Sequence, residues 1–192
     1  MMFTLYSADY IGAPSNCSYP HKFEVTDATT LTEAVKKDYV CAEYLNSYRN
    51  GENFIGADCL PVDCDNDHSE NPADWVSPED VKKAFPGITF AVHYSRSHMR
   101  EKNGKGARPK FHVLFPIDTM TDASAYSEMK KLVNTIFPYF DSKALDAARF
   151  FFGTATPEVE VYEGEMTLSE FLSAEDFDAD MANNGQPTST IT

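Results

Sequence analysis

The chain has 192 residues, 42% of them hydrophobic, with 14 Phe and 10 Tyr, a composition typical of a globular protein with its own core. No apolar run has the length of a membrane span, and the N-terminus MMFTLYSADY lacks the basic and apolar regions of a secretory signal, so we expect a cytoplasmic protein with no membrane partner. The formal net charge of −14 argues against a simple basic nucleic-acid binder.

The first half of the chain begins with an expected strand at 2–8 and a loop at 9–30. Thr30 followed by Glu33 predicts a helix N-terminus and a helix over 30–40. An apolar run at 53–62 predicts a strand that leads into an acidic cluster.

The segment 77–85 predicts a helix, because Ser77 is a good N-cap and Pro78 suits the first helical position. Alternating apolar residues predict an antiparallel pair of strands at 87–95 and 109–116, joined by a loop too long for a tight turn. We further expect a helix at 121–137, a helical turn running into a strand at 144–153, a strand at 158–162 and a short helix at 167–172.

This order of elements predicts an α/β (α+β) fold with a mixed or antiparallel sheet, formed by one domain over residues 1–173. Residues 174–192 are acidic and polar, and we expect a disordered tail or linker there. The four Cys show no CxxC spacing, which indicates buried free thiols rather than disulfides or a zinc site.

The charge is unevenly distributed along the chain. Nine acids and no Lys or Arg follow Arg149, so residues 1–149 account for only −5 of the net charge. Within them, the segment 96–110 (RSHMREKNGKGARPK) holds six basic residues and one Glu. We call this segment the basic loop. A solvated surface turn is the common explanation of such a run, so its role depends on its neighbours.

The acidic cluster lies in the stretch LPVDCDNDHSE (60–70). Residues two apart on a strand point to the same side, so Asp63 and Asp65 share a face while Val62 and Cys64 point to the core. Two such carboxylates can bridge paired divalent cations about 3.5–4 Å apart. A solvated acidic loop is the alternative. A third interpretation, an EF-hand, fails because its sixth position is His68 instead of Gly.

His112 and Lys110 share one face of the predicted strand at 109–116. The adjoining loop adds cations, hydroxyls and an imidazole that suit a polyphosphate: Arg96, Ser97, His98 and Arg100. Zinc bound by His93 and His98 is a weaker alternative.

The segment YFDSKALDAARFFFG contains Asp141, Asp146 and Arg149. Taken alone, either Asp is explained as a helix N-cap and Arg149 as one side of a surface ion pair.

Together these motifs resemble the archaeo-eukaryotic primase superfamily, and in particular the primase-polymerase domains of phage and mobile-element replication proteins. The likeness covers roughly residues 50–153 and depends on PVDCDND, on HYSRSH with RPKFHVLFP, and on FDSKALDAARFFFG. In one departure, the Ser that the family often has two residues before the catalytic His is replaced here by Lys110.

The resemblance implies a sheet with a catalytic palm like that of an RNA-recognition motif, packed against a small α/β portion. It implies template-dependent nucleotidyl transfer, as a DNA primase and/or DNA polymerase, with two Mg²⁺ or Mn²⁺ ions, nucleoside triphosphates (NTP or dNTP) and a single-stranded DNA template. The implied catalytic residues are Asp63, Asp65, Asp141 and His112, with Asp146 as second choice to Asp141 for the third metal ligand. The implied nucleotide-binding residues are Ser95, Arg96, Ser97, His98, Lys110, His112 and Arg149.

Two alternatives remain open at this point. One is a metal-dependent nuclease that uses the same carboxylates. The other is a catalytically weak nucleotide- or DNA-binding module of a replication initiator, which the overall acidity of the chain keeps in play. A fused or separate helicase could supply the basic surface that this chain lacks.

Overall fold

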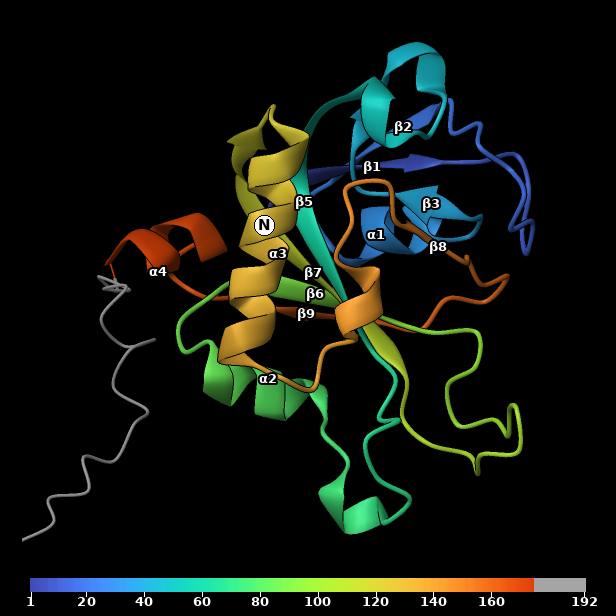
Figure 1. The fold of residues 1–192 in the computed structure, drawn as a ribbon, viewed down its shortest axis with the longest axis vertical. Coiled ribbons are helices and arrows are strands. Elements are labelled where there is room, and N and C mark those ends of the chain that lie inside the picture. Colours follow the sequence, from blue (N-terminus) through green and yellow to red (C-terminus); the bar gives the residue numbers. More distant parts are fainter. Residues whose placement is uncertain (175–192) are drawn as a thin grey trace, which may run out of the picture.

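The structure is a computed structural model, and it describes residues 1–174 (Figure 1). The tail expected at 174–192 therefore lies almost wholly outside the described residues. The strands are β1 (Phe3–Ser7), β2 (His21–Val25), β3 (Tyr39–Val40), β4 (Glu43–Tyr44), β5 (Phe54–Cys64), β6 (Phe90–Tyr94), β7 (Phe111–Met120), β8 (Phe150–Phe151) and β9 (Val159–Tyr162). The helices are α1 (Ala28–Ala34), α2 (Pro78–Ala84), α3 (Ala123–Ile136) and α4 (Leu168–Ala174).

The strands form two antiparallel sheets, one of five strands in the order β4-β5-β7-β6-β9 and one of four in the order β2-β1-β3-β8. In the larger sheet, α2 connects β5 to β6 and β7 pairs between them, which is the split β-α-β arrangement of ferredoxin-like folds. The predicted α+β class is confirmed. The smaller sheet and α1 form the second α/β portion.

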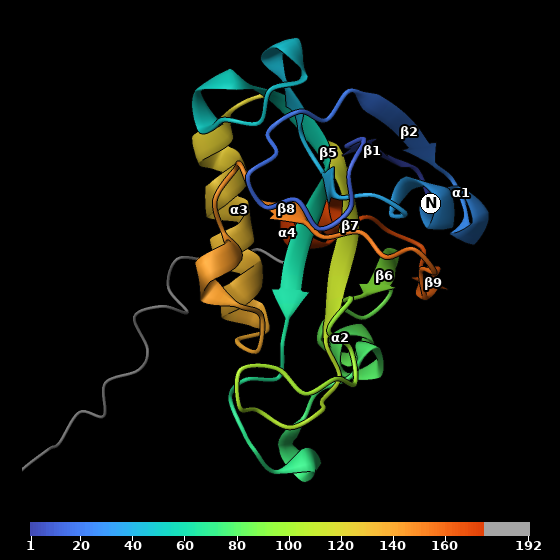
Figure 2. The ribbon, with the colours of Figure 1, turned by 90° about the vertical axis from the view of Figure 1, so that its right-hand side faces the viewer.

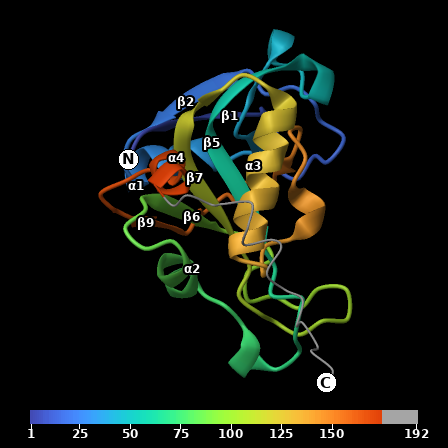
Figure 3. The same cartoon turned by 60° about the vertical axis from the view of Figure 1, so that its left-hand side comes forward.

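Each face of the larger sheet covers a different core. The face that carries Leu60, Val62 and Cys64 packs against α2, α3 and α4. The opposite face, with Cys59 and Leu114, packs against the smaller sheet and α1. Figure 2 shows these layers, with α3 on one side of β5 and β7 and with β1, β2 and α1 on the other, while Figure 3 shows α4 against β7. The alternation in β5 thus directs Asp63 away from α2, α3 and α4.

Two early elements differ from the sequence prediction. The expected loop contains β2, an edge strand with only Val25 fully buried, so its apolar alternation is too weak to stand out in the sequence. The helix starts at Ala28, because Asp27 is the N-cap and forms a capping box with Thr30. Thr30 is therefore inside the helix, and the end of the predicted helix is instead β3.

The remaining expected elements are confirmed, and most of their ends lie within one to three residues of the predicted positions. Ser77 is the N-cap of α2 with a capping box to Asp80, and Asp122 caps α3. All four cysteines are free; three are buried and Cys17 is half-buried. Among the residues that the structure describes, no helix has the length and apolar character needed to cross a membrane.

Candidate active site

Three carboxylates meet at the end of β5. Asp63 is buried, with 6% of its surface exposed, and Asp65 is half-buried just past the strand. Asp141 follows α3, and its backbone N–H donates to the carbonyl oxygen of Asp63 at 2.7 Å. One oxygen of each carboxylate lies within 4.8 Å of the others. The three residues predicted as metal ligands therefore lie together.

Asp146, the second choice for the third ligand, does not belong to this group. Its carboxylate accepts a hydrogen bond from the Ala148 N–H at 2.9 Å, and its carbonyl oxygen accepts one from Lys130 at 2.8 Å. The geometry favours Asp141.

Two cationic or polar groups bind the carboxylate of Asp63. His112 is its register partner on β7 and donates from Nδ1 to Asp63 Oδ1 at 3.0 Å. Arg149 donates from Nη2 to Asp63 Oδ2 at 3.5 Å. Burial alone raises the pKa of the Asp63 carboxyl, but His112 and Arg149 outweigh that effect and hold its pKa below the usual value. Asp63 is therefore ionised at neutral pH.

Lys110 compensates the other acids of the cluster. Its buried ammonium lies 3.2 Å from Asp65 Oδ1 and 3.3 Å from Asp67 Oδ1. Burial and the charge of Asp63 raise the pKa of the Asp65 carboxyl, while Lys110 lowers it, and the net result is a raised pKa. The Lys110 side chain, predicted to bind nucleotide, is thus already paired with two carboxylates.

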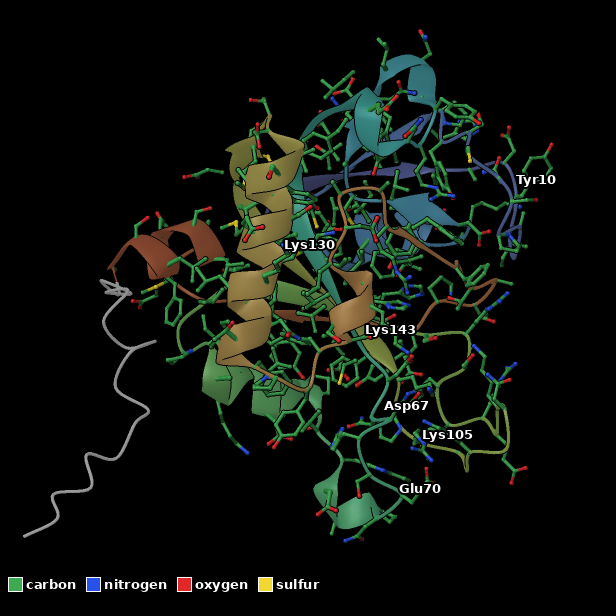
Figure 4. The ribbon with its side chains drawn as sticks, viewed as in Figure 1. Tyr10, Asp67, Glu70, Lys105, Lys130 and Lys143 are labelled. Atoms are coloured by element: carbon green, nitrogen blue, oxygen red, sulfur yellow. The ribbon has the colours of Figure 1, made fainter. Side chains whose placement is uncertain are left out.

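Asp67 lies outside the three-carboxylate group and contacts the basic loop. Figure 4 shows Asp67 beside Lys105, and Lys105 Nζ is 3.1 Å from Asp67 Oδ2. The guanidinium of Arg108 is fully buried and donates to Glu70 at 2.6 Å and to the Asn66 carbonyl oxygen at 3.1 Å. Sequence reasoning missed this: part of the basic loop is a structural anchor, and nothing in the local pattern distinguishes Arg108 from its solvated neighbours.

A cavity of about 160 Å³ brings the acids and the basic loop together. Its lining includes Asp63, Asp65, Ser95, Arg96, Ser97, Lys102, His112 and Arg149. An adjoining cavity of about 520 Å³ also contains Ser95 and Arg96 in its wall. We call them the acid cavity and the outer cavity.

The structure does not bring every predicted residue into the acid cavity. His98 lines the outer cavity, where its Nδ1 accepts from the Lys110 N–H at 3.2 Å. The zinc alternative is not supported, because both ring nitrogens of His93 are hydrogen-bonded, to Tyr39 and to Thr154.

Sequence reasoning also missed the aromatic wall of the acid cavity, formed by Phe150, Phe151 and Phe152. The Arg96 guanidinium lies 3.5 Å from the centre of the Phe152 ring, which holds the cation in position. The run RFFFG was the available signal, although the pattern alone does not separate a core strand from a cavity wall.

The fold and the site together define an α+β protein in which a three-carboxylate cluster adjoins a cavity that is also lined by the cationic side chains of Arg96 and Arg149. No family model and no curated protein matches the chain. Among solved structures it is similar to the AEP domain of the cyanophage S-2L primase-polymerase (PrimPol), with 13% identity, a TM-score of 0.49, and coverage of 89% of this chain and 88% of that one. A likeness of this degree does not assign an activity, which therefore depends on the site residues.

Proposed function

We propose that this chain is a template-dependent nucleotidyltransferase, a DNA primase and/or DNA polymerase domain that uses nucleoside triphosphates on single-stranded DNA. The observation that carries the proposal is the meeting of three carboxylates, from Asp63, Asp65 and Asp141, within 4.8 Å. Two of them, Asp63 and Asp65, line a cavity that Arg96 and Arg149 also line. A metal site beside fixed cations suits phosphoryl chemistry.

The donor set fits Mg²⁺ or Mn²⁺. All three groups offer hard carboxylate oxygens, the ligands that these ions prefer, and none is a Cys or His that would favour zinc. When bound by Asp63, Asp65 and Asp141, such ions would activate a 3′-hydroxyl and neutralise charge on a triphosphate.

The side chains of the acid cavity supply the remaining binding groups. The Nε of Arg149 is buried and has no hydrogen-bond partner among residues 1–174. The Arg149 side chain lines the acid cavity, where its positive charge suits a phosphate group. His112 uses Nδ1 for Asp63, which leaves Nε2 for the ligand. Arg96, held on Phe152, adds a preorganised positive charge.

The proposal is tested by primer synthesis and primer extension on single-stranded DNA, with ribo- and deoxyribonucleotides and with Mg²⁺ or Mn²⁺. The wild type should incorporate nucleotide, and Asp63→Asn should lose about 100-fold or more in rate, since removal of metal-site partners already costs 10–100-fold. Asp118→Asn, an exposed Asp on β7, is the matched control and should retain activity. Lack of incorporation by folded wild type, where a control polymerase works, would refute the proposal.

The same experiment separates the alternatives. A nuclease would shorten labelled DNA without added triphosphate. A binding module would give a calorimetric signal with nucleotide but no product. Either result would replace the proposed function.

A further inference from the structure

A buried chain of hydrogen bonds leads from the core to the outer cavity. The hydroxyl of Tyr39, on β3, lies 3.0 Å from Nδ1 of His93, on β6. Nε2 of His93 lies 3.0 Å from the hydroxyl oxygen of Thr154, just after β8. Tyr39 and His93 are fully buried, and Thr154 is half-buried and lines the outer cavity. Tyr39 and Thr154 were not predicted as functional residues, and His93 was considered only as a ligand in the weaker zinc alternative.

The donor-to-acceptor direction of this series of hydrogen bonds follows from its buried end, the Tyr39 hydroxyl. Among the described residues the Tyr39 hydroxyl has no other hydrogen-bond partner, so its proton must point to Nδ1 of His93. Burial raises the pKa of Tyr39 and lowers that of His93, which keeps both groups neutral. A neutral imidazole that accepts at Nδ1 carries its proton on Nε2. His93 therefore donates to Thr154.

The Thr154 hydroxyl is left with a proton that no described residue accepts. Its oxygen already accepts from His93, and within residues 1–174 it makes no further hydrogen bond. The backbone around it is rigid, because the Thr154 N–H donates to the Val35 carbonyl oxygen at 3.1 Å and the Gly153 N–H donates to buried Asp38 at 2.9 Å. The hydroxyl is thus a preorganised donor in the cavity wall.

The volumes of the two cavities indicate which part of a bound nucleotide the Thr154 hydroxyl would contact. The acid cavity, at about 160 Å³, is smaller than the roughly 300–1,000 Å³ of most small-molecule sites, whereas the outer cavity, at about 520 Å³, falls within that range. The two share Ser95 and Arg96. A nucleotide with its phosphates in the acid cavity would therefore extend its nucleoside into the outer cavity.

We propose that the Thr154 hydroxyl donates a hydrogen bond to an acceptor on the nucleoside of the bound nucleotide. Tyr39 and His93 are positioning residues that keep this proton directed into the cavity. The inference rests on the proposed function, because it takes the ligand to be a nucleotide bound at the acid cavity.

Thr154→Val removes the donor at nearly constant volume. Loss of one neutral hydrogen bond, worth about 0.5–1.5 kcal/mol, should weaken nucleotide binding and raise KM by about 2- to 13-fold with kcat nearly unchanged. Thr154→Ser should restore the wild-type KM. Thr135→Val, on the exposed side of α3, is the matched control. A rise shared by all four bases would assign the acceptor to the sugar, and one confined to some bases would assign it to the base.

The donor-to-acceptor direction from Tyr39 through His93 to Thr154 is tested separately. Nitrogen-15 NMR should show His93 as the Nε2–H tautomer in the wild type. In Tyr39→Phe, Nδ1 of His93 no longer receives a hydrogen bond, so the Nδ1–H tautomer of His93 becomes accessible. The Thr154 hydroxyl can then donate to Nε2 of His93 instead of to the nucleotide, and KM should rise as in Thr154→Val. Wild-type His93 in the Nδ1–H form would overturn the inference.

The outcomes also separate this inference from the proposed function. Incorporation by the wild type with an unchanged KM in Thr154→Val refutes the inference alone. Nucleotide binding without incorporation refutes the proposed function alone, and calorimetric Kd values for the same variants then decide the inference. Absence of nucleotide binding by folded wild type refutes both.

Discussion

Asp141→Asn should abolish most of the divalent-cation affinity of the site while leaving the fold intact. The half-buried Asp141 carboxylate has an oxygen within 4.8 Å of the Asp63 and Asp65 ligand atoms. It also caps the turn Ser142–Ala144 by accepting from the Lys143 N–H at 2.9 Å. Asn caps as well as Asp, so the substitution removes charge without removing the turn.

The size of the effect follows from Coulomb's law. Two unit charges about 4 Å apart interact by about 1 kcal/mol in water and about 4 kcal/mol at an effective dielectric constant of 20. A dication doubles these values. Since Asp141 is half-buried, we take the lower part of that range, about 2–4 kcal/mol, which corresponds to about 30- to 900-fold weaker binding.

Calorimetry or electron paramagnetic resonance with Mn²⁺ measures this affinity without any assay of activity. Asp146→Asn is the matched control, because that carboxylate only accepts from the Ala148 N–H. The unfolding free energy of metal-free Asp141→Asn should stay within about 0.5 kcal/mol of wild type or exceed it, since one of three neighbouring like charges is gone. Mn²⁺ binding as tight in Asp141→Asn as in wild type, or lost in Asp146→Asn, would refute the assignment.

Three further predictions concern stability. Burial lowers the pKa of Lys130 to about 8. Above pH 8 the folded state loses the Lys130 proton while the unfolded state keeps it, so wild type should gain stability relative to Lys130→Met as the pH rises. The difference between their unfolding free energies should increase by about 3 kcal/mol between pH 8 and pH 10.5. Urea titrations measure this difference, and a value that does not change with pH would contradict the prediction. In Gly153→Ala the new Cβ would lie 2.2 Å from the Lys37 carbonyl oxygen, so we expect a melting temperature at least about 6 °C lower than that of wild type. Gly51→Ala is the control and should change the melting temperature little, because a Cβ at Gly51 would have no atom within 4 Å. Arg108→Met leaves the buried Asn66 carbonyl oxygen without its donor and should cost about 1–3 kcal/mol in urea unfolding; a cost below 0.5 kcal/mol would show that this anchor is dispensable.

The elements around the site were predictable because their signals are local. In β5 and β7 the side chains alternate, so the sequence alone showed that Asp63 and Asp65 share a side and that His112 faces away from Phe111. The cap residue of α2 acts within one turn, and its predicted identity, Ser77, is confirmed.

Short strands were harder, because their stability comes from pairing instead of composition. β3 has two residues and forms only where Tyr39 meets Phe151 across more than a hundred residues of chain. β2 was missed because it is an edge strand in which only Val25 is fully buried. No local pattern marks a segment whose hydrogen-bond partner lies elsewhere in the chain.

The residue types of the site and their likeness to a polymerase-type cluster were determined by the sequence: alternate carboxylates, a strand histidine, and an Asp followed by an Arg. Only the tertiary structure determined that Asp141 lies beside Asp63 and Asp65, that Lys110 pairs with Asp65, and that Arg108 is buried. Periodicity sets which side of a strand a residue occupies, but distances between charges from different elements depend on how those elements pack. The balance of the acidic charges of Asp63 and Asp65 by His112, Arg149 and Lys110 therefore depends on the packing of the folded protein.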